Sequence, residues 1–376
     1  WFLSRLEDEA VIAAIGYASS ILFFTISIGI GLSIAATSLV SPAIGAGYRV
    51  RARRLSVNVH LATFAVSLLL GVGVWFAASW MLTQLGANGR AHDLARDYLD
   101  ILLPSLPLLA VAMTSAAVLR SVGDARRAMN VTLIIAVVNV LLDPILIFGL
   151  DLGIRGAAIA STVARAAALA VGLYGVIKVH DLMGRPRLRP FLGDVRAMLA
   201  IAGPAILTNI ATPAANAYVT WAIAPSGDAA VAAWAIIGRI MPVAFGAIYA
   251  LSGTIGPIIG QNHGARHYDR VRQAIQQSLA VTAVFTLVAW VFLALFAAPL
   301  ASTFRATGEA GELVILFCRT LAPLFVFMGA LFISNAVFNT LGYAHYSTVL
   351  NWLRATLGTI PFVEAGAAMG GAKGVL

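Results

Sequence analysis

The sequence contains few charged residues. Only 11% of its 376 residues are Asp, Glu, Lys or Arg, whereas 60% are apolar, and the mean hydropathy is +0.90. A soluble protein of ordinary composition contains about 25% charged residues. The composition therefore excludes an ordinary soluble protein and indicates a chain that lies mainly in a lipid bilayer.

Cysteines and metal-binding patterns are also scarce. Cys318 is the only cysteine, which excludes an internal disulfide framework and a thiolate metal cluster. The six histidines show no metal-ligand spacing, and the segment from Gly31 to Ala35 only approaches a serine-nucleophile motif. These absences disfavour an enzyme, and we expect no cofactor other than a transported ion.

Long apolar runs dominate the chain instead. A helix needs about 20 apolar residues to cross the hydrocarbon core of a bilayer, which is about 30 Å thick. Runs of this kind lie at 10–44, 56–85, 98–121, 127–150, 153–178, 197–223, 229–260, 275–303, 312–341 and 346–370. We therefore predict an all-α polytopic membrane protein with ten helices and little chain left for a soluble domain.

The formal net charge of +9 is concentrated in alternate loops between these runs. The richer set comprises Arg49, Arg51, Arg53, Arg54, Arg120, Arg126, Arg127, Lys178, Arg185, Arg187, Arg189, Arg196, Arg266, Arg270 and Arg272. The opposite loops hold only Arg5, Arg90, Arg96, Arg155, Arg305 and Lys373. Cytoplasmic loops carry the excess of Lys and Arg, so the first set is predicted to be cytoplasmic. The basic character thus indicates membrane orientation rather than a nucleic-acid partner.

The chain also repeats itself at an offset of 219 residues. "EAVIAAIG" at 9–16 aligns with "DAAVAAWA" at 228–235, Pro104 aligns with Pro323, and Gly123 aligns with Gly342. After a one-residue slip, "GIRG" at 153–156 aligns with "GAKG" at 371–374. The matched prolines, glycines and loop charges favour an internal duplication over chance similarity among Ala- and Gly-rich helices.

This repeat predicts two lobes. The offset carries the first apolar run onto the seventh, so the unit is six helices, and two such units lie parallel, related by a pseudo-twofold axis along the membrane normal. Two helices of the repeat find no partner, and "WFLSRLEDEA" lacks an initiator methionine. We therefore expect a twelve-helix parent whose first and last helices lie beyond this chain. The predicted amino-terminal lobe is 1–178, the cytoplasmic linker 179–196 and the carboxy-terminal lobe 197–376.

Three stretches resemble the multidrug and toxic compound extrusion (MATE) family. "VSPAIGAGYRVRARR" at 40–54 and "GPIIGQNHGARHYDRVRQA" at 256–274 look like that family's paired motif after the second and eighth helices. "LRSVGDARRAMNVTLIIAVVNVLLDPILIFGLDLGIRGAAIAS" at 119–161 is similar to its fourth-to-sixth helix region, with the pattern N-x-x-x-D-P. The resemblance covers essentially the whole chain.

The resemblance implies a secondary active efflux transporter. Such a protein exports small amphipathic or cationic compounds in exchange for H⁺ or Na⁺ by alternating access, here as a monomer in a bacterial inner membrane. Flippases for lipid-linked oligosaccharides share the broader fold but usually lack N-x-x-x-D-P, and they are the alternative. A membrane enzyme or a channel has less support in the sequence.

The resemblance also assigns a cation-coupling site to the amino-terminal lobe. In one branch of the family, this site uses an Asp on helix 1, an Asn and an Asp on helix 5 and a Thr on helix 6. Asn139, Asp143 and Ser161 occupy the last three positions here, and Ser161 retains the hydroxyl. The helix-1 Asp falls before the first residue of this chain. Na⁺ at Asp143 is the one metal ion that the resemblance suggests.

Residue spacing adds a charge partner to this site. Asn139 and Asp143 are four residues apart and share one helix face, while Pro144 bends the helix and frees carbonyl groups. Reflection through the following turn places Ser161 opposite Asp143 and Arg165 opposite Asn139. Asp143 is expected either to load and release the coupling ion, as intramembrane charges usually do, or to stay paired with Arg165 and lock two helices together.

A second group of polar residues is predicted to line a cavity in the carboxy-terminal lobe. These residues are Thr208, Asn209, Thr212, Asn216, Arg239, Tyr249 and Glu364. Hydrogen bonds between helices, aromatic packing and snorkelling of the arginine are the competing explanations. Arg319 and Arg354 also lie within or near predicted helices. They are expected either to face the cavity, or to snorkel or form hydrogen bonds between helices.

Overall fold

The computed structural model describes residues 9–184 and 188–375. Within these ranges, the regular structure is helical throughout. Eight of the described helical stretches are long and apolar enough to cross a membrane, and α8 (Asp228–Ala244) with α9 (Gly246–Gly264), bent by 54°, adds a ninth. The predicted all-α polytopic membrane fold is confirmed. Arg5, Arg185 and Arg187 of the predicted loops lie outside the described residues.

The chain divides into two compact units, Trp1–Ile206 and Leu207–Leu376. The boundary falls within α7 (Leu188–Ile223). The lobes at 1–178 and 197–376 and the linker at 179–196 stay a prediction.

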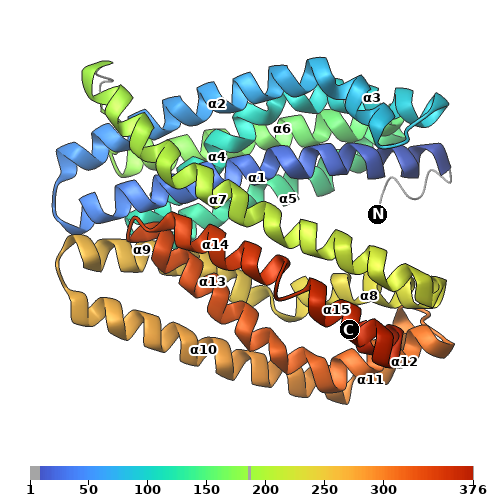
Figure 1. Ribbon diagram of the computed structural model, residues 1–376. Coiled ribbons are helices and arrows are strands. Elements are labelled where there is room, and N and C mark those ends of the chain that lie inside the picture. The colour runs from blue at the N-terminus through green and yellow to red at the C-terminus, as the bar shows by residue number, and fades with distance from the viewer. Residues whose placement is uncertain (1–8, 185–187, 376) are drawn as a thin grey trace. The chain divides into compact units, whose positions relative to one another are not determined.

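The first unit is built around α4. Its helices are α1 (Glu9–Gly45), α2 (Arg49–Gln84), α3 (Gly89–Leu102), η2 (Leu103–Ser105), α4 (Leu106–Ser121), α5 (Ala125–Pro144), η3 (Ile145–Gly149), α6 (Gly153–Tyr174) and η4 (Gly175–Val179). Helix α4 packs against α1, α2, α5 and α6, and these helices run side by side in Figure 1. Small side chains permit this close packing, since Ala112, Ala116 and Ala117 of α4 are at most 4% exposed.

The second unit is built around α13. Besides α8 and α9, its helices are η5 (Ala224–Ser226), α10 (Tyr268–Leu295), α11 (Ala297–Thr303), α12 (Gly308–Leu316), η6 (Phe317–Leu321), η7 (Ala322–Leu324), α13 (Phe325–Thr340), α14 (Ala344–Ala355), α15 (Ile360–Gly370) and α16 (Ala372–Val375). Helix α13 packs against α9, α10 and α14. At its start, the Phe325 ring stacks on Phe245 with ring centroids 4.0 Å apart.

Helix boundaries in the second unit reproduce those of the first at the 219-residue offset. Helix α1 aligns with the α8 and α9 pair, η2 with η7, and α4 with α13, each beginning and ending at aligned residues. The turns that follow α4 and α13 contain Gly123 with φ 84° and Gly342 with φ 88°. A positive φ favours glycine, so the duplicated glycines mark the same turn in both units.

The tenth predicted run, 346–370, forms two shorter helices, α14 and α15. Between them, the Thr359 hydroxyl donates a hydrogen bond of 2.8 Å to the Arg354 carbonyl. The Gly358 amide donates one of 2.8 Å to the Leu353 carbonyl. These local bonds replace the regular helical ladder and hold a defined break inside an apolar segment.

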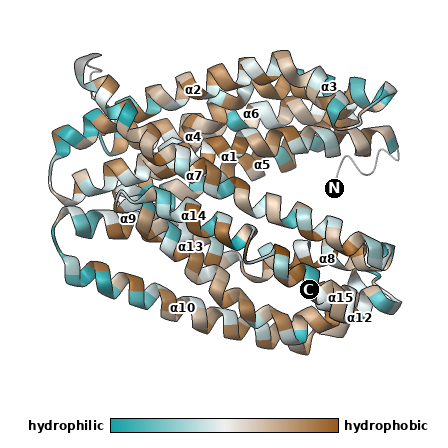
Figure 2. Cartoon of the chain, in the orientation of Figure 1, coloured by the Kyte–Doolittle hydropathy of each residue, from teal (hydrophilic) through white to brown (hydrophobic). Residues whose placement is uncertain are grey.

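Apolar side chains cover much of the outer surface. Leu69, Phe76 and Leu295 are each 74% exposed, as expected for side chains that face lipid rather than water. Figure 2 shows hydrophobic colour along the lengths of the helices and hydrophilic colour near their ends, as at the start of α10. The protein is thus an integral, multi-pass membrane protein.

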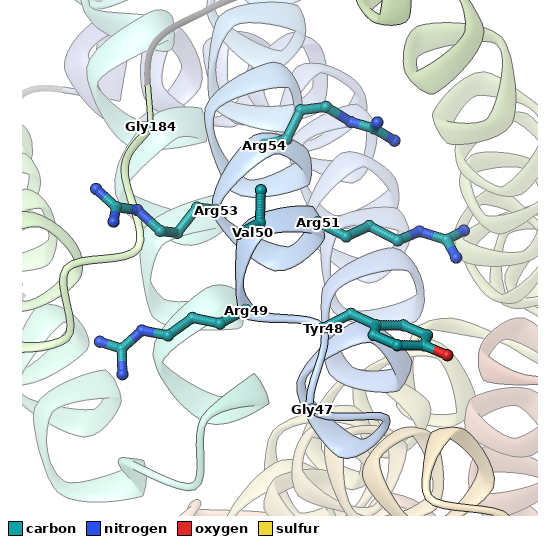
Figure 3. Close-up of a pocket in the computed structure, with 8 residues that line it drawn as sticks. All are labelled: Gly47, Tyr48, Arg49, Val50, Arg51, Arg53, Arg54 and Gly184. Carbon is teal, nitrogen blue, oxygen red and sulfur yellow. The ribbon is translucent and has the colours of Figure 1, made fainter.

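Two arginines in the first turns of α2 fasten the segment that follows η4. Arg49 donates a hydrogen bond of 3.1 Å to the His180 carbonyl, and Arg53 forms an ion pair of 3.0 Å with Asp181. In Figure 3, both arginines extend on the side of α2 where Gly184 lies. The basic cluster that predicts the cytoplasmic side therefore also has a structural role.

Asp124 directly precedes the first residue of α5. It links the segment that follows η4, at His180, to the turn between α4 and α5. Its carboxylate accepts hydrogen bonds from the Arg127 amide at 3.0 Å and from Arg127 Nη1 at 2.7 Å, and it lies 2.7 Å from His180 Nε2. The side chain is only 10% exposed. Burial alone raises the pKa, but the hydrogen bonds from His180 and Arg127 outweigh it and lower the pKa of Asp124 from 3.8 to about 2.

Gly156 permits the close packing of α6 on the end of α5. A Cβ added at Gly156 would lie 2.6 Å from the Leu146 carbonyl oxygen in η3. Because a backbone atom cannot move away easily, a larger residue would push α6 off the preceding segment. The geometry at the end of α5 therefore depends on this glycine.

We predict that Gly156→Ala destabilises the protein by about 1–3 kcal/mol through overpacking. The matched control is Gly16→Ala, since a Cβ at Gly16 in α1 would meet nothing within 4 Å. Thermal unfolding of both variants in detergent measures the difference. Equal melting temperatures for the two variants would contradict the close approach at Gly156.

The lowered pKa of Asp124 predicts that its contribution to stability depends on pH in the acid range. The pKa of Asp124 is about 2 in the folded protein against 3.8 without its partners, so its ionised form stabilises the fold above pH 3.8, and this contribution is lost as the pH falls toward 2. Asp124→Asn should therefore lower the melting temperature at pH 7, with the deficit shrinking between pH 4 and pH 2. Asp93→Asn, at a side chain that is 83% exposed, is the control and should show no such convergence.

Candidate functional site

Asp143 lies where α5 departs from regular helical geometry. Pro144 is the last residue of α5, and a π-helical turn, η3, follows it directly. Proline lacks the amide that would continue the ladder, and a single π-helical turn of this kind is frequent at functional sites. The local sequence thus places a carboxylate beside an irregular turn inside an apolar span.

The polar groups of α5 keep unused oxygen atoms. Asp143 and Asn139 are half-buried, and the Asn139 Oδ1 atom is enclosed without a hydrogen-bond partner. Within residues 9–184 and 188–375, no ion pair includes Asp143. Both oxygens can coordinate a cation, and the carboxylate can also take up a proton.

Arg165 binds elsewhere than the spacing suggested. Its Nη1 atom donates hydrogen bonds of 3.1 Å to the Leu102 carbonyl and 2.7 Å to Ser105 Oγ, and the residue is only 7% exposed. Pro104 lies in this break between α3 and α4 and makes carbonyl groups available there. In the described part of the chain, the guanidinium of Arg165 therefore holds the break in place, and no ion pair joins it to Asp143.

Tyr98 is a further candidate residue that the spacing along α5 and α6 does not reveal. Tyr98 lies on α3, one turn before Leu102, whose carbonyl accepts the hydrogen bond from Arg165. The spacing of Tyr98, Leu102 and Ser105 is that of residues on one helix face. This spacing is the sequence feature that could have indicated Tyr98. A comparison of α5 with α6 alone does not reveal a residue on α3.

Ser161 lies on α6, which packs along α5, one turn before Arg165. The side chain is half-buried, and its hydroxyl makes no hydrogen bond to the described residues. On the same turn, Thr162 Oγ1 is enclosed without a partner. The first unit thus contributes a carboxylate, an amide and hydroxyl groups from two adjacent helices.

The predicted polar residues of α7 contact the broken helix α14 and α15. Arg354 Nη2 donates a hydrogen bond of 3.0 Å to Thr212 Oγ1, and the Tyr218 hydroxyl donates one of 3.1 Å to Glu364 Oε1. Thr208 Oγ1 lies 3.3 Å from Thr348 Oγ1.

The other candidates in the second unit are more dispersed. Asn209 is half-buried on α7, and the Asn216 carbonyl accepts a hydrogen bond of 2.8 Å from Thr220 Oγ1 in its own helix. Arg239 is exposed on α8. The Tyr249 ring on α9 packs against Phe332, with centroids 5.1 Å apart. Aromatic packing therefore accounts for one face of Tyr249.

An ion site at Asp143 would consist mainly of oxygen ligands. Among the described residues, no group of three or more His, Cys, Asp or Glu side chains is placed to hold a metal ion. Asp143 with Asn139 and Ser161 offers one charged and two neutral oxygen donors, which suits H⁺ or a monovalent hard cation better than a transition metal.

Comparisons with known proteins agree with this architecture. The family model described as MatE matches residues 1–145 and 204–363. A FAD transporter of Shewanella oneidensis is 31% identical to the chain, over 100% of the chain and 84% of that protein. A probable multidrug resistance protein NorM of Thermotoga maritima is 25% identical, over 83% of the chain and 68% of that protein.

A solved structure shows the same fold. The crystal structure of a mutant of the Vibrio cholerae MATE transporter VcmN has a TM-score of 0.95 at 27% identity, with 100% of this chain and 85% of that chain covered. The same transporter in its bent form has a TM-score of 0.94 over the same shares.

The contacts of Arg165 predict unequal effects of two substitutions. Arg165→Gln removes two hydrogen bonds from a charged donor and should destabilise the protein by about 1.5–3 kcal/mol. Asp143→Asn removes no ion pair formed by the described residues, so the expected change is within roughly 0.5 kcal/mol. Thermal unfolding in detergent checks both. Equal destabilisation by the two variants would show that a fixed Asp143–Arg165 pair exists after all.

Proposed function

Because the chain belongs to the multidrug and toxic compound extrusion family of membrane transporters, we propose that it is a secondary active exporter of organic compounds. It exchanges them for H⁺ or Na⁺ by alternating access and acts as a monomer. The half-buried carboxylate of Asp143, without an ion-pair partner among the described residues, is the observation that carries this proposal.

The coupling chemistry follows from the surroundings of Asp143. An ionised carboxylate in an apolar span is destabilised unless a cation or a proton neutralises it. Arg165, the buried cation on the neighbouring helix, is occupied by Leu102 and Ser105. Asp143 is therefore free to take up the coupling ion from one side of the membrane and to release it on the other.

Neutral oxygens support the bound ion. Asn139 Oδ1 is enclosed without a donor, and Ser161 supplies a hydroxyl on α6. These groups serve as ligands for Na⁺ or as hydrogen-bond partners of a protonated carboxyl. The π-helical turn after Pro144 is the element of α5 that we expect to rearrange between the loaded and unloaded states.

The relatives suggest which substrates to test first. One carries the name FAD transporter and another the name multidrug export protein MepA. We propose that this protein transports small organic compounds with an aromatic ring, flavin adenine dinucleotide (FAD) among them.

Transport by the full chain in proteoliposomes tests the proposal. Outward movement of FAD and of a fluorescent organic cation is followed under an imposed pH gradient or an imposed Na⁺ gradient. Asp143→Asn should reduce gradient-driven transport about tenfold or more, because the variant cannot exchange its charge. Asp151→Asn, at an exposed aspartate in the next turn, is the matched control and should transport normally.

Two results would contradict the proposal. If neither gradient drove transport of any compound by the wild-type protein, it would not be an antiporter. If Asp143→Asn kept full gradient-driven transport, the coupling site would lie elsewhere.

A further inference from the structure

Arg354 places a guanidinium group inside the apolar segment 346–370, which the sequence predicts to cross the membrane. It lies in the last turn of α14, and Figure 1 shows the break that leads from α14 into α15. At 1.5 Å per residue it is about 15 Å from the start of α14, or half of the roughly 30 Å hydrocarbon core. In a segment that crosses the membrane, a charge at this position needs compensation from the protein or from a ligand.

Only some of the N–H donors of the Arg354 guanidinium have a hydrogen-bond partner among the described residues. Its Nη2 atom donates to the neutral hydroxyl of Thr212 at 3.0 Å, whereas its Nε atom is enclosed and has no partner. Among the described residues, no carboxylate lies within ion-pair distance of Arg354. Glu364, on the following helix, instead accepts a hydrogen bond from Tyr218.

An uncompensated guanidinium in a span is unstable by itself. Removing a cation from water is expensive unless an anion and further hydrogen bonds replace the water. Arginine carries five N–H donors in a planar fork that matches carboxylate and phosphate oxygens. The unmet requirement of Arg354 is therefore a negative charge with at least two acceptor oxygens.

The helix break holds this residue in position. The Arg354 carbonyl accepts the Thr359 hydroxyl at 2.8 Å. A Cβ added at Gly358 would lie 2.9 Å from the same carbonyl oxygen, so the chain returns closely on the end of α14. Interrupted helices of this kind form substrate sites in secondary transporters.

Joining α14 to α7 does not require Arg354. The Trp352 indole donates a hydrogen bond of 3.1 Å to the Leu207 carbonyl, and Thr208 and Thr348 lie 3.3 Å apart through their hydroxyl oxygens. These uncharged contacts already join the two helices.

We infer that Arg354, with Thr212, binds an anionic group of the transported compound, a phosphate or a carboxylate. The inference rests on the proposed function and narrows its substrate class from organic compounds in general to those that carry such a group. The same phosphate chemistry occurs in soluble dinucleotides and in lipid-linked sugars, so both sources belong in the test.

The experiment compares two probes that share the isoalloxazine ring and differ in phosphate content. FAD carries two phosphates, whereas riboflavin has the same isoalloxazine ring without phosphate. Arg354→Gln should reduce FAD transport in proteoliposomes about tenfold or more and change riboflavin transport less than about twofold. Arg354→Lys, which retains the charge without the planar fork, should fall between the wild type and Arg354→Gln for FAD.

Matched controls separate this role from loss of charge and from loss of structure. Arg305→Gln removes one exposed arginine of the same unit and should leave the transport of both probes unaffected.

A lipid-linked pyrophosphate added to the vesicles distinguishes the two phosphate sources. Competition with FAD by the lipid alone assigns the site to a lipid-linked substrate, and competition by soluble ADP assigns it to a soluble one. Either result supports an anion site.

Two outcomes would overturn the inference. One is equal loss of FAD and riboflavin transport in Arg354→Gln, which would mean a structural role. The other is wild-type transport of organic cations without transport of any anion, a result that leaves the exporter proposal intact.

Equilibrium binding provides an independent test where transport or folding of a variant fails. Flavin fluorescence titration of the purified wild-type protein should give an affinity for FAD about tenfold or more above that for riboflavin. Equal affinities would refute the anion site, whatever the transport result.

Discussion

The absence of water in the hydrocarbon core is the constraint on which this structure depends. Every backbone amide and carbonyl within the membrane must be paired inside the protein, which leaves helices as the local structure. Polar side chains meet the same requirement, mostly within their own helix. Ser38 and Ser41 of α1, for example, donate to carbonyls four residues earlier, at 2.9 Å and 2.7 Å. Hydroxyl groups are therefore inexpensive in these spans, whereas charges are not.

Arg165, Asp143 and Arg354 are three charged residues of helical segments, and the protein compensates their charges to different extents. Arg165 is satisfied by the carbonyl and hydroxyl groups at the α3–α4 break. Among the described residues, no ion pair includes Asp143 or Arg354. The first arrangement stabilises one structure, while the other two leave a charge that a mobile ion or a ligand neutralises. Unmet pairing thus separates the residues that we propose to act in transport from those that hold the fold.

Much of the fold was predictable from the sequence because the repeat fixes where helices begin and end. The duplicated Gly123 and Gly342 and the duplicated Pro104 and Pro323 recur at equivalent structural positions. The break between α14 and α15 was not predictable, since hydropathy alone does not distinguish one long apolar helix from two short ones. Its hydrogen bonds at Leu353 and Arg354 involve backbone groups that residue types do not reveal.

The candidate site was predictable only in part, for a related reason. Spacing along a helix relates Asn139 to Asp143, and family resemblance adds Ser161. The partners of Arg165 come from a third helix, where Pro104 opens the backbone, so a comparison of α5 with α6 could not identify them. The same limit applies to Tyr98, which lies on α3.

The repeat also explains why the two proposed roles differ between the units. The position aligned with Asp143 is Phe362, and the position aligned with Arg354 is Ile135. The duplicated frame therefore carries opposite charges at different places, each beside an irregular turn of equivalent helices. An acid in one unit suits a coupling cation, and a base in the other suits an anionic substrate. Because neither charge has a counterpart in the other half, duplication supplies the scaffold, and the roles arise from the residues that break its symmetry.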